Sequence, residues 1–339
     1  MLTLLYPAYD QMVMANWPDP TPRSGEVRIR VSACGICGSE LEAFKGRSPR
    51  RVPPLVMGHE FCGVIDEIGP NVPSFRPGDQ VVSHSLFGCR ECVRCREGQI
   101  HLCARRQLFG MHLPGGFAEY VVAPERSLLK WPSNVPAEAA CLAEPLANGV
   151  HVVNLIRHLE PRSVVVIGAG PIGMFCQQAI KAMLGIDTIT CDLIPERLTH
   201  AARLGASATI NSRRENVVKR VHELTSGEGA DVVVDAVGGS LTKRLSLSST
   251  RPGGAAVWIG LHENTVTLDT YEVTLSERQI YGSYAATMEE LQTAIDLLAQ
   301  GQVDATSWTK TFKLDDGVDA FQRMMEARGD DIKAVLKPH

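Results

Sequence analysis

A glycine-rich turn between an apolar strand and a helix constrains the fold of this chain more than any other feature. Residues 164–167 (VVVI) form an apolar run of strand length, residues 168–173 read GAGPIG, and the helix-like stretch MFCQQAIKAMLG follows. In a G-x-G-x-x-G motif the first glycine allows a tight turn, the second lets the backbone approach a pyrophosphate, and the third lets helix and strand pack closely. The N-terminus of the helix also attracts phosphates. The motif therefore predicts a dinucleotide site formed by Gly168, Gly170, Pro171, Ile172 and Gly173.

An acidic residue follows at the expected distance. The next strand, residues 188–191, ends at Asp192, and this motif usually places an acid about 20 residues beyond its first glycine. A carboxylate there accepts a hydrogen bond from the 2′-hydroxyl of the adenosine ribose and repels a 2′-phosphate. We therefore expect NAD rather than NADP, and we expect Arg197 to belong to the same site.

Strands and helices alternate through the middle of the chain. Helical patterns at 195–205, at 216–227 and from Leu241 onward separate apolar strand patterns at 207–211, 231–238, 254–260 and 279–284. Such alternation predicts a doubly wound parallel sheet. We place this dinucleotide-binding domain at residues 147–285.

The remainder of the chain has a different pattern. Before about residue 136, short strand-like runs such as 26–31 are broken by Gly63, Gly69, Gly78 and several prolines, which predicts a partly open β-barrel. Two amphipathic helices at 288–301 and 316–329 and a strand at 332–338 come last, and we expect them to pack on the barrel. Residues 1–146 and 286–339 are thus predicted to form one domain.

Four cysteines lie in one short polar segment, residues 88–104. Cys89, Cys92, Cys95 and Cys103 have the spacing Cys-x2-Cys-x2-Cys-x7-Cys, which lets four sulfurs converge. Tetrahedral thiolate coordination suits Zn²⁺, and a four-cysteine site leaves no position open for a substrate, so such a zinc ion is structural. An iron–sulfur cluster and four plain reduced cysteines are the alternatives. Nearby Arg90, Arg94 and Arg96 either offset the thiolate charge or form a solvated surface.

Composition excludes several classes of protein. The net charge of −4 argues against a nucleic-acid surface, and no apolar run approaches the roughly 20 residues needed to cross a bilayer. The first residues lack the basic region of a signal peptide, so we expect a cytoplasmic protein whose thiols stay reduced.

A second metal-binding set is scattered along the chain. His59 lies in the sequence Gly-His-Glu, and Cys37 and Glu144 are candidate partners. Cysteine, histidine and carboxylate together form a zinc site with room for an exchangeable ligand. Because these positions are far apart, spacing alone favours a structural histidine over a metal ligand.

Taken together, the motifs resemble those of the zinc-dependent medium-chain dehydrogenase family. They are CGICGSE at 34–40, GHEFCGVIDEIGPNV at 58–72, PGDQVV at 77–82, the four-cysteine segment, AEPL at 143–146 and GAGPIG at 168–173. The resemblance implies a GroES-like barrel with a Rossmann domain, a catalytic and a structural zinc, NAD, and a homo-oligomer, either dimer or tetramer. It covers nearly the whole chain.

The resemblance also implies roles for single residues. Cys37 and His59 match the catalytic zinc ligands, and Glu144, in a context similar to the polyol branch, lies in or beside the ligand set. Glu60 matches a carboxylate that exchanges onto the metal, and Ser39 matches the hydroxyl that carries the alcohol proton away.

Three departures from the family pattern concern the relay and the substrate. Glu40 stands where many relatives have aspartate, and Glu42 where many have the relay histidine. Residues 284–286 (YAA) stand where sorbitol dehydrogenases have an arginine. Glu42 is either a relay group or part of a solvated helix face.

The activity that we expect is oxidation of a secondary alcohol of a polyol, sugar or sugar derivative with NAD. L-Threonine 3-dehydrogenase or 2,3-butanediol dehydrogenase activity is the alternative. The charge argues against a zinc-ribbon protein that binds nucleic acid, and the intact set of Cys37, Ser39, His59 and Glu144 argues against a non-catalytic redox regulator.

Overall fold

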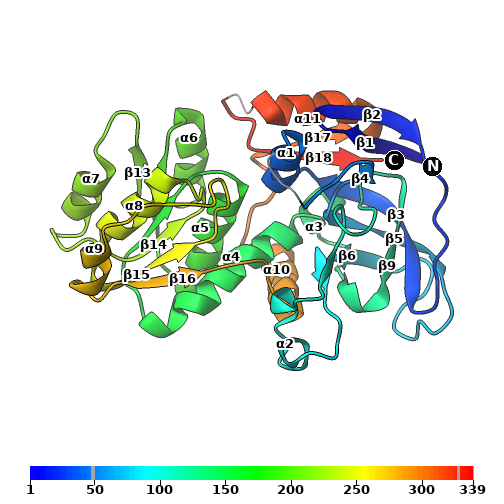
Figure 1. Ribbon diagram of the computed structural model, residues 1–339, viewed down its shortest axis with the longest axis horizontal. Coiled ribbons are helices and arrows are strands. Elements are labelled where there is room, and N and C mark those ends of the chain that lie inside the picture. Colours follow the sequence, from blue (N-terminus) through cyan, green and yellow to red (C-terminus); the bar gives the residue numbers. More distant parts are fainter. Residues whose placement is uncertain (47–49, 327–328, 339) are drawn as a thin grey trace. The chain divides into compact units, whose positions relative to one another are not determined.

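The computed structural model describes residues 1–46, 50–326 and 329–338. It divides into two compact units, of which the first comprises Met1–Glu144, Thr287–Gly301 and Ala305–His339. The second comprises Pro145–Ala286 and Gln302–Asp304. Figure 1 shows that each unit has its own sheet. Residues 327 and 328, in the second predicted tail helix, lie outside the described residues.

The first unit is built from short strands. Its strands are β1 (Leu2–Ala8), β2 (Gln11–Asn16), β3 (Glu26–Gly35), β4 (Leu55–Val56), β5 (Glu60–Ile68), β6 (Gln80–Ser83), β7 (Leu86–Phe87), β8 (Gln107–Leu108), β9 (Tyr120–Pro124), β10 (Leu128–Lys130), β17 (Thr309–Lys313) and β18 (Lys333–Lys337). Its helices are α1 (Gly38–Phe44), α2 (Val93–Arg96), α3 (Ala137–Ala140), α10 (Met288–Ala299) and α11 (Gly317–Glu326), with short 3-10 turns at Ile100–Leu102, Glu125–Ser127 and Leu314–Asp316.

Strand β3 is the centre of this unit. It pairs with β5, β9 and β18 in a sheet of order β10-β6-β5-β3-β18-β17, with β9 on the side of this path. Residues alternate between buried and half-buried along the first part of β3, as expected for a strand with one face on a core. The C-terminal strand β18 thus lies beside β3, with Val335 opposite Gly35.

The second unit has one six-stranded parallel sheet. Its strands are β11 (Val164–Ile167), β12 (Ile189–Asp192), β13 (Ala208–Asn211), β14 (Ala230–Asp235), β15 (Thr250–Trp258) and β16 (Gln279–Gly282). Its helices are α5 (Pro171–Leu184), α6 (Pro195–Arg203), α7 (Val217–Leu224), α8 (Ser240–Ser249) and α9 (Thr270–Thr274), while α4 (Ala143–Ile156) begins in the first unit and a 3-10 turn at Arg157–Leu159 follows it.

The strand order of this sheet is β13-β12-β11-β14-β15-β16, and every pair is parallel. Numbered along the sheet, this is the 3-2-1-4-5-6 order of the Rossmann fold, whose ligands bind where the order reverses. All the residues of β11 and β14 are buried, because helices cover both faces of such a sheet. The predicted α/β fold class, a GroES-like barrel with a Rossmann sheet, is confirmed.

The structure differs from the sequence-based prediction at two strands. Strand β15 begins at Thr250, earlier than the predicted start at 254, although Pro252 and Gly253 resemble a turn. A register shift in the β14–β15 pairing accommodates them, as in a β-bulge. Strand β17 was not predicted, because TKTFK is a polar edge strand without an apolar run.

Candidate active site and metal centres

Pairing of β3 with β5 brings the scattered metal-binding residues together. Gly35, at the end of β3, lies opposite Glu60, the first residue of β5. Cys37 follows β3 and immediately precedes α1, and His59 immediately precedes β5. One ligand atom each from Cys37, His59 and Glu60 lies within 4.8 Å of the others. The topology therefore supplies the convergence that sequence spacing could not establish.

Glu144 lies near this group without belonging to it. It is in the first turn of α4, is 8% exposed, and interacts electrostatically with both His59 and Glu60. Burial raises the pKa of its carboxyl, and Glu60 adds to this effect, while His59 and a hydrogen bond with Ser85 oppose it. A buried carboxylate of this kind is stabilised by any cation that enters the site.

Glu40 orients His59. Its Oε1 accepts hydrogen bonds from His59 Nδ1 at 2.8 Å and from the Gly58 backbone N–H at 2.9 Å, and its Oε2 accepts from the Cys37 N–H at 2.9 Å. Binding Nδ1 leaves Nε2 of His59 as the ring nitrogen for a metal. The glutamate that departs from the family pattern therefore has a defined task. The Cys-x-x-Glu spacing at the start of α1 resembles a capping box. This spacing is the sequence signal by which the task of Glu40 could have been recognised.

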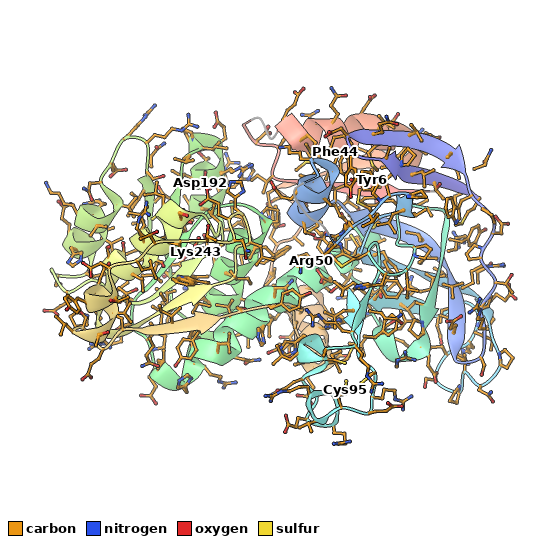
Figure 2. All side chains as sticks on the ribbon, in the orientation of Figure 1. Tyr6, Phe44, Arg50, Cys95, Asp192 and Lys243 are labelled. Carbon is orange, nitrogen blue, oxygen red and sulfur yellow. The ribbon has the colours of Figure 1, made fainter. Side chains whose placement is uncertain are left out.

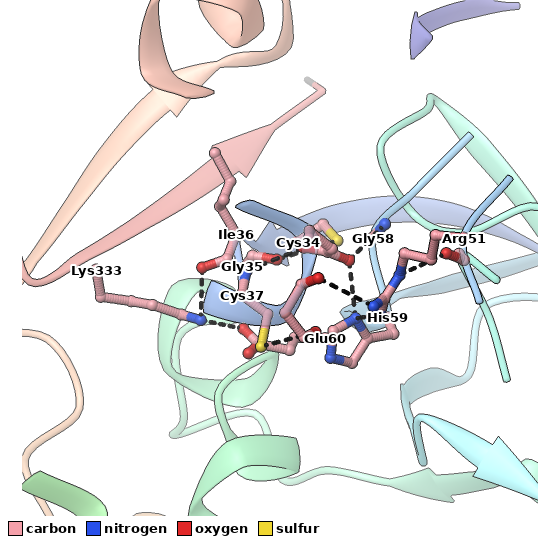
Figure 3. A network of polar contacts seen from close by, with 12 residues as sticks. Cys34, Gly35, Ile36, Cys37, Arg51, Gly58, His59, Glu60 and Lys333 are labelled. Atoms are coloured by element: carbon pink, nitrogen blue, oxygen red, sulfur yellow. Dashed lines mark hydrogen bonds and ion pairs between the residues drawn. The ribbon is translucent and has the colours of Figure 1, made fainter. Parts of the chain in front are cut away.

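Two buried cations flank the site on opposite sides, as Figure 3 shows. Arg51 donates to the Gly110 and Ser39 carbonyls at 2.9 and 3.1 Å, and its Nη2 lies 3.4 Å from His59 Nδ1. Lys333 donates to the carbonyl of Ile36 at 2.9 Å and forms an ion pair with Glu60. The sequence analysis did not identify either cation.

The charges of the site fit a divalent cation. Four acidic groups, namely Cys37, Glu40, Glu60 and Glu144, outnumber the two buried cations Arg51 and Lys333. Burial lowers the pKa of His59, but Glu40 and Cys37 outweigh it and the pKa is raised. The site thus favours positive charge where the ligand atoms meet, and the donor set of thiolate, imidazole and carboxylate suits Zn²⁺.

Ser39 and Glu42 are placed on α1 beside the metal group. Ser39 is half-buried, and its hydroxyl donates to Cys37 Sγ over 3.4 Å. This contact puts a protonated oxygen next to a ligand sulfur. Glu42 is half-buried on the same helix, and its predicted relay role stays a prediction.

The four-cysteine segment also forms a metal-binding group. The Sγ atoms of Cys89, Cys92, Cys95 and Cys103 all lie within 4.8 Å of one another. Strands β7 and β8 pair at its base, and Figure 2 labels Cys95 in this lobe. A Cβ on Gly88 would overlap the sulfur of Cys95, so only glycine fits there.

Backbone N–H groups of this lobe stabilise the thiolate form of Cys89. Those of Glu91 and Cys92 lower the pKa of the Cys89 thiol to about 6, whereas burial raises that of Cys95 to about 11. A metal ion removes the difference, because all four sulfurs bind it as thiolates.

Arg94 and Arg96 fit the second of the two alternatives given for this lobe, a solvated surface. Arg94 donates to Glu97 and Gln99, and Arg96 donates to the carbonyl of Glu91. Arg105, which the sequence analysis did not single out, donates to Cys89 Sγ at 3.3 Å. Of these three arginines, Arg105 is the one whose guanidinium contacts a thiol, and it lies two residues after Cys103.

Each glycine of the GAGPIG turn has its own structural reason. Gly168 has a positive φ of 97°, and a Cβ at Gly173 would overlap the carbonyl oxygen of Gly168. A Cβ built on Gly170 meets no atom within 4 Å. Gly170 is thus not needed for packing, and the open space beside it, at the N-terminus of α5, fits the approach of a pyrophosphate.

Asp192 ends β12 and braces this turn. Its Oδ2 accepts from the Ala169 N–H at 2.7 Å and its Oδ1 from the Ile194 N–H at 2.8 Å. Each oxygen keeps a lone pair for a ribose hydroxyl. The buried Nε of Arg197, on α6, has no hydrogen-bond partner among the described residues, which fits a side chain that awaits a ligand.

Comparison with known proteins identifies the family. The profile of the alcohol dehydrogenase GroES-like domain matches residues 23–133, and that of zinc-binding dehydrogenase matches residues 171–300. The chain is 36% identical over 338 residues to D-arabitol-phosphate dehydrogenase of Enterococcus avium, covering 98% of this chain and 95% of the relative. The chain belongs to the zinc-dependent medium-chain dehydrogenase family.

Other relatives of this dehydrogenase are named for different substrates. The chain is 33% identical over 334 residues to L-threonine 3-dehydrogenase of Pyrococcus horikoshii, covering 96% of this chain and 95% of the relative. A solved alcohol dehydrogenase from Escherichia coli CFT073, in complex with NADH, matches with a TM-score of 0.92, 29% identity and 99% coverage of both chains. The dehydrogenase is thus an alcohol dehydrogenase with zinc and NAD as cofactors, as predicted. None of the helices in the described part of the chain is long and apolar enough to cross a membrane.

Cofactor choice in the dehydrogenase can be tested at Asp192. We expect Asp192→Asn, which loses the charge and keeps an acceptor oxygen for one of the two backbone N–H groups, to narrow the preference for NAD over NADP by about tenfold or more. Asp192→Ala should also weaken NAD, because the turn loses its brace. The ratio of kcat/KM values for the two cofactors is the measurement. A wild-type enzyme that prefers NADP, or an unchanged ratio in both variants, would reject this role.

Proposed function

We propose that the enzyme oxidises a secondary alcohol that has a neighbouring hydroxyl, in a polyol, sugar or sugar derivative, with NAD as the hydride acceptor. The observation that supports this proposal is Glu144, a buried carboxylate that interacts electrostatically with His59 and Glu60. Such a group can accept from a second substrate hydroxyl, and a substrate without that hydroxyl lacks this contact. The name of the Enterococcus avium relative, which acts on arabitol phosphate, supports a polyol substrate.

Residue roles follow from the contacts described above. Cys37 and His59 would hold the catalytic zinc, with Glu60 as the exchanging carboxylate, and Cys89, Cys92, Cys95 and Cys103 would hold the structural zinc. Glu144, which interacts electrostatically with His59 and Glu60, would complete the catalytic ligand set. When bound, the catalytic zinc supplies Lewis acidity that lowers the pKa of the substrate hydroxyl. Ser39, whose hydroxyl lies next to Cys37, would accept that proton while it releases its own to Glu42 or to water.

The nucleotide site is assigned to the second unit. The turn of Gly168, Gly170, Pro171, Ile172 and Gly173 would receive the pyrophosphate at the start of α5. Asp192 would accept from the adenosine ribose, and Arg197 would contact the same half of NAD through its unpaired Nε.

A second candidate function is L-threonine 3-dehydrogenase or 2,3-butanediol dehydrogenase activity. The 33% identity with the Pyrococcus horikoshii enzyme favours it. Threonine and butanediol also have a polar group beside the reacting carbon, so Glu144 is compatible with both. The two candidates differ in the length of the substrate and in the charge of its neighbouring group.

A substrate panel tests the proposal. The rate of NADH formation at 340 nm is compared for vicinal diols and for alkanols of the same carbon skeleton, such as 2,3-butanediol and 2-butanol. We expect kcat/KM to be at least about 100-fold higher for the diols. Pentitols, hexitols and their phosphate esters, together with L-threonine, then separate the two candidate functions.

The outcomes are distinct. Equal or better values for the alkanols reject the role of a second hydroxyl but leave the enzyme an alcohol dehydrogenase. A preference for L-threonine over every polyol replaces the first candidate with the second. Glu138→Ala, a half-exposed carboxylate on α3 that pairs with Lys337, is the control and should leave the ratio unchanged.

We also propose that the enzyme is a homo-oligomer, dimer or tetramer, and is cytoplasmic. Exposed apolar side chains of the second unit, including Leu261, Tyr271 and Leu275, support self-association because solvent-exposed apolar surface is costly. Light scattering of the purified enzyme measures the assembly, and a monomeric mass would reject it.

A further inference from the structure

A buried ion pair lies at the edge of the proposed catalytic centre. Lys333 and Glu60 have side chains that are each 1% exposed, and they pair directly. The ammonium also donates to the carbonyl of Ile36 at 2.9 Å. Figure 3 shows Lys333 approaching Glu60 from the side opposite to Arg51. This pair has no role in the proton and hydride transfers assigned above.

The pairing of β18 with β3 determines the position of Lys333. Strand β18 runs beside β3, so a lysine near its start points to the end of β3 where Cys37 follows. Gly35 makes the necessary space, since a Cβ there would overlap Glu60 Oε2 and lie 3.1 Å from the Cε of Lys333. Burial lowers the pKa of Lys333, but Glu60 and Cys37 outweigh it and the pKa is raised.

Glu60 therefore has two competing partners. Its carboxylate belongs to the ligand group with Cys37 and His59, and it also neutralises Lys333. If both oxygens turned to a metal, an ammonium that is 1% exposed would lose its counter-charge. Breaking a buried ion pair by removing one partner is strongly destabilising, so the pair opposes that movement.

We propose that Lys333 is a positioning residue that restrains the exchange of Glu60 onto the catalytic zinc and so keeps a coordination position open for the substrate. This rests on the proposed function, in which Cys37 and His59 hold that zinc. With Glu60 retained by Lys333, Glu144 is the carboxylate that completes the ligand set. Without the ammonium, Glu60 becomes a further ligand, and the metal is held more tightly in a more crowded site.

The test replaces the catalytic zinc by Co²⁺, whose visible absorption reports the number of ligands. In Lys333→Met we expect weaker, higher-coordinate bands, and release of the metal to a chelator that is about tenfold slower than in the wild type. Lys333→Arg, which keeps the charge, should retain the wild-type spectrum. The double variant Lys333→Met/Glu60→Gln should also return to it, because the freed carboxylate is gone.

A second route covers the case in which Lys333→Met does not fold. Gly35→Ala keeps both charges but displaces Glu60 from Lys333, and it should produce the same bands and slower release. An unchanged spectrum and release rate in Lys333→Met, or in Gly35→Ala if the first variant is insoluble, would overturn the proposal. Failure of the wild-type enzyme to bind Co²⁺ through Cys37 is a different result, because it rejects the metal site on which the proposed function depends.

Discussion

Replacement of Glu144 by alanine is expected to lower kcat by about 10²–10³-fold while the dissociation constant for NAD stays within about twofold of the wild-type value. The substitution removes a buried carboxylate that interacts with His59 and Glu60 and is the hydrogen-bond partner of Ser85. The residues of the glycine turn belong to the other compact unit, so NAD binding should be spared. Steady-state kinetics and a fluorescence titration with NADH provide the two measurements.

One further variant separates the charge of Glu144 from its shape, and a second variant is a control. Glu144→Gln keeps the volume and one acceptor oxygen but loses the charge, and should fall between the wild type and Glu144→Ala. The control Glu138→Ala removes a half-exposed carboxylate of α3 and should leave kcat within about twofold. A kcat for Glu144→Ala within a few-fold of the wild type would remove Glu144 from the reaction.

Cys92→Ser is expected to reduce the zinc content from two ions per chain to one, because the chain has two groups that can hold a metal. The lobe of β7, α2 and β8 should lose its main cross-link. A loss of about 3 kcal/mol would lower Tm by roughly 6–12 °C. Elemental analysis and thermal unfolding measure both effects, and activity at low temperature should persist.

Cys37→Ser is the matched comparison. It also removes one zinc ion, but from the other group, so activity should be lost with a smaller change in Tm. The two variants thus have equal metal content and opposite consequences. Iron in the purified wild type, or full activity with a single zinc ion, would contradict the assignment of the two sites.

The fold could be predicted in large part because its signals are local. The Gly168–Gly173 turn, the acid at Asp192 and the alternation of strands and helices each depend on residues close in sequence. Strand β17 was missed because its pairing with β18 is decided by tertiary contacts, and a polar edge strand has little apolar periodicity. The start of β15 was misjudged because a bulge tolerates residues that usually mark turns.

The site was predictable only where a motif existed. Cys37 and His59 lie in recognisable motifs, but their convergence depends on the β3–β5 register. Arg51 had no signal, because a basic residue in a basic loop is ordinarily exposed. Lys333 had a weak sequence signal, because it is a lysine at the start of a mainly apolar strand. The structure shows that this lysine is buried.

The position of β18 in the sheet has a consequence for how the enzyme is made. The strand that contains Lys333 pairs with β3, and Lys333 follows Glu60 by 273 residues in the chain. During translation the β3–β5 pair therefore waits, with Glu60 lacking its counter-charge, until β18 has been synthesised. When β18 pairs with β3, the sheet gains this strand and Glu60 gains its counter-charge, Lys333, in the same step. A product truncated before Lys333 therefore lacks both.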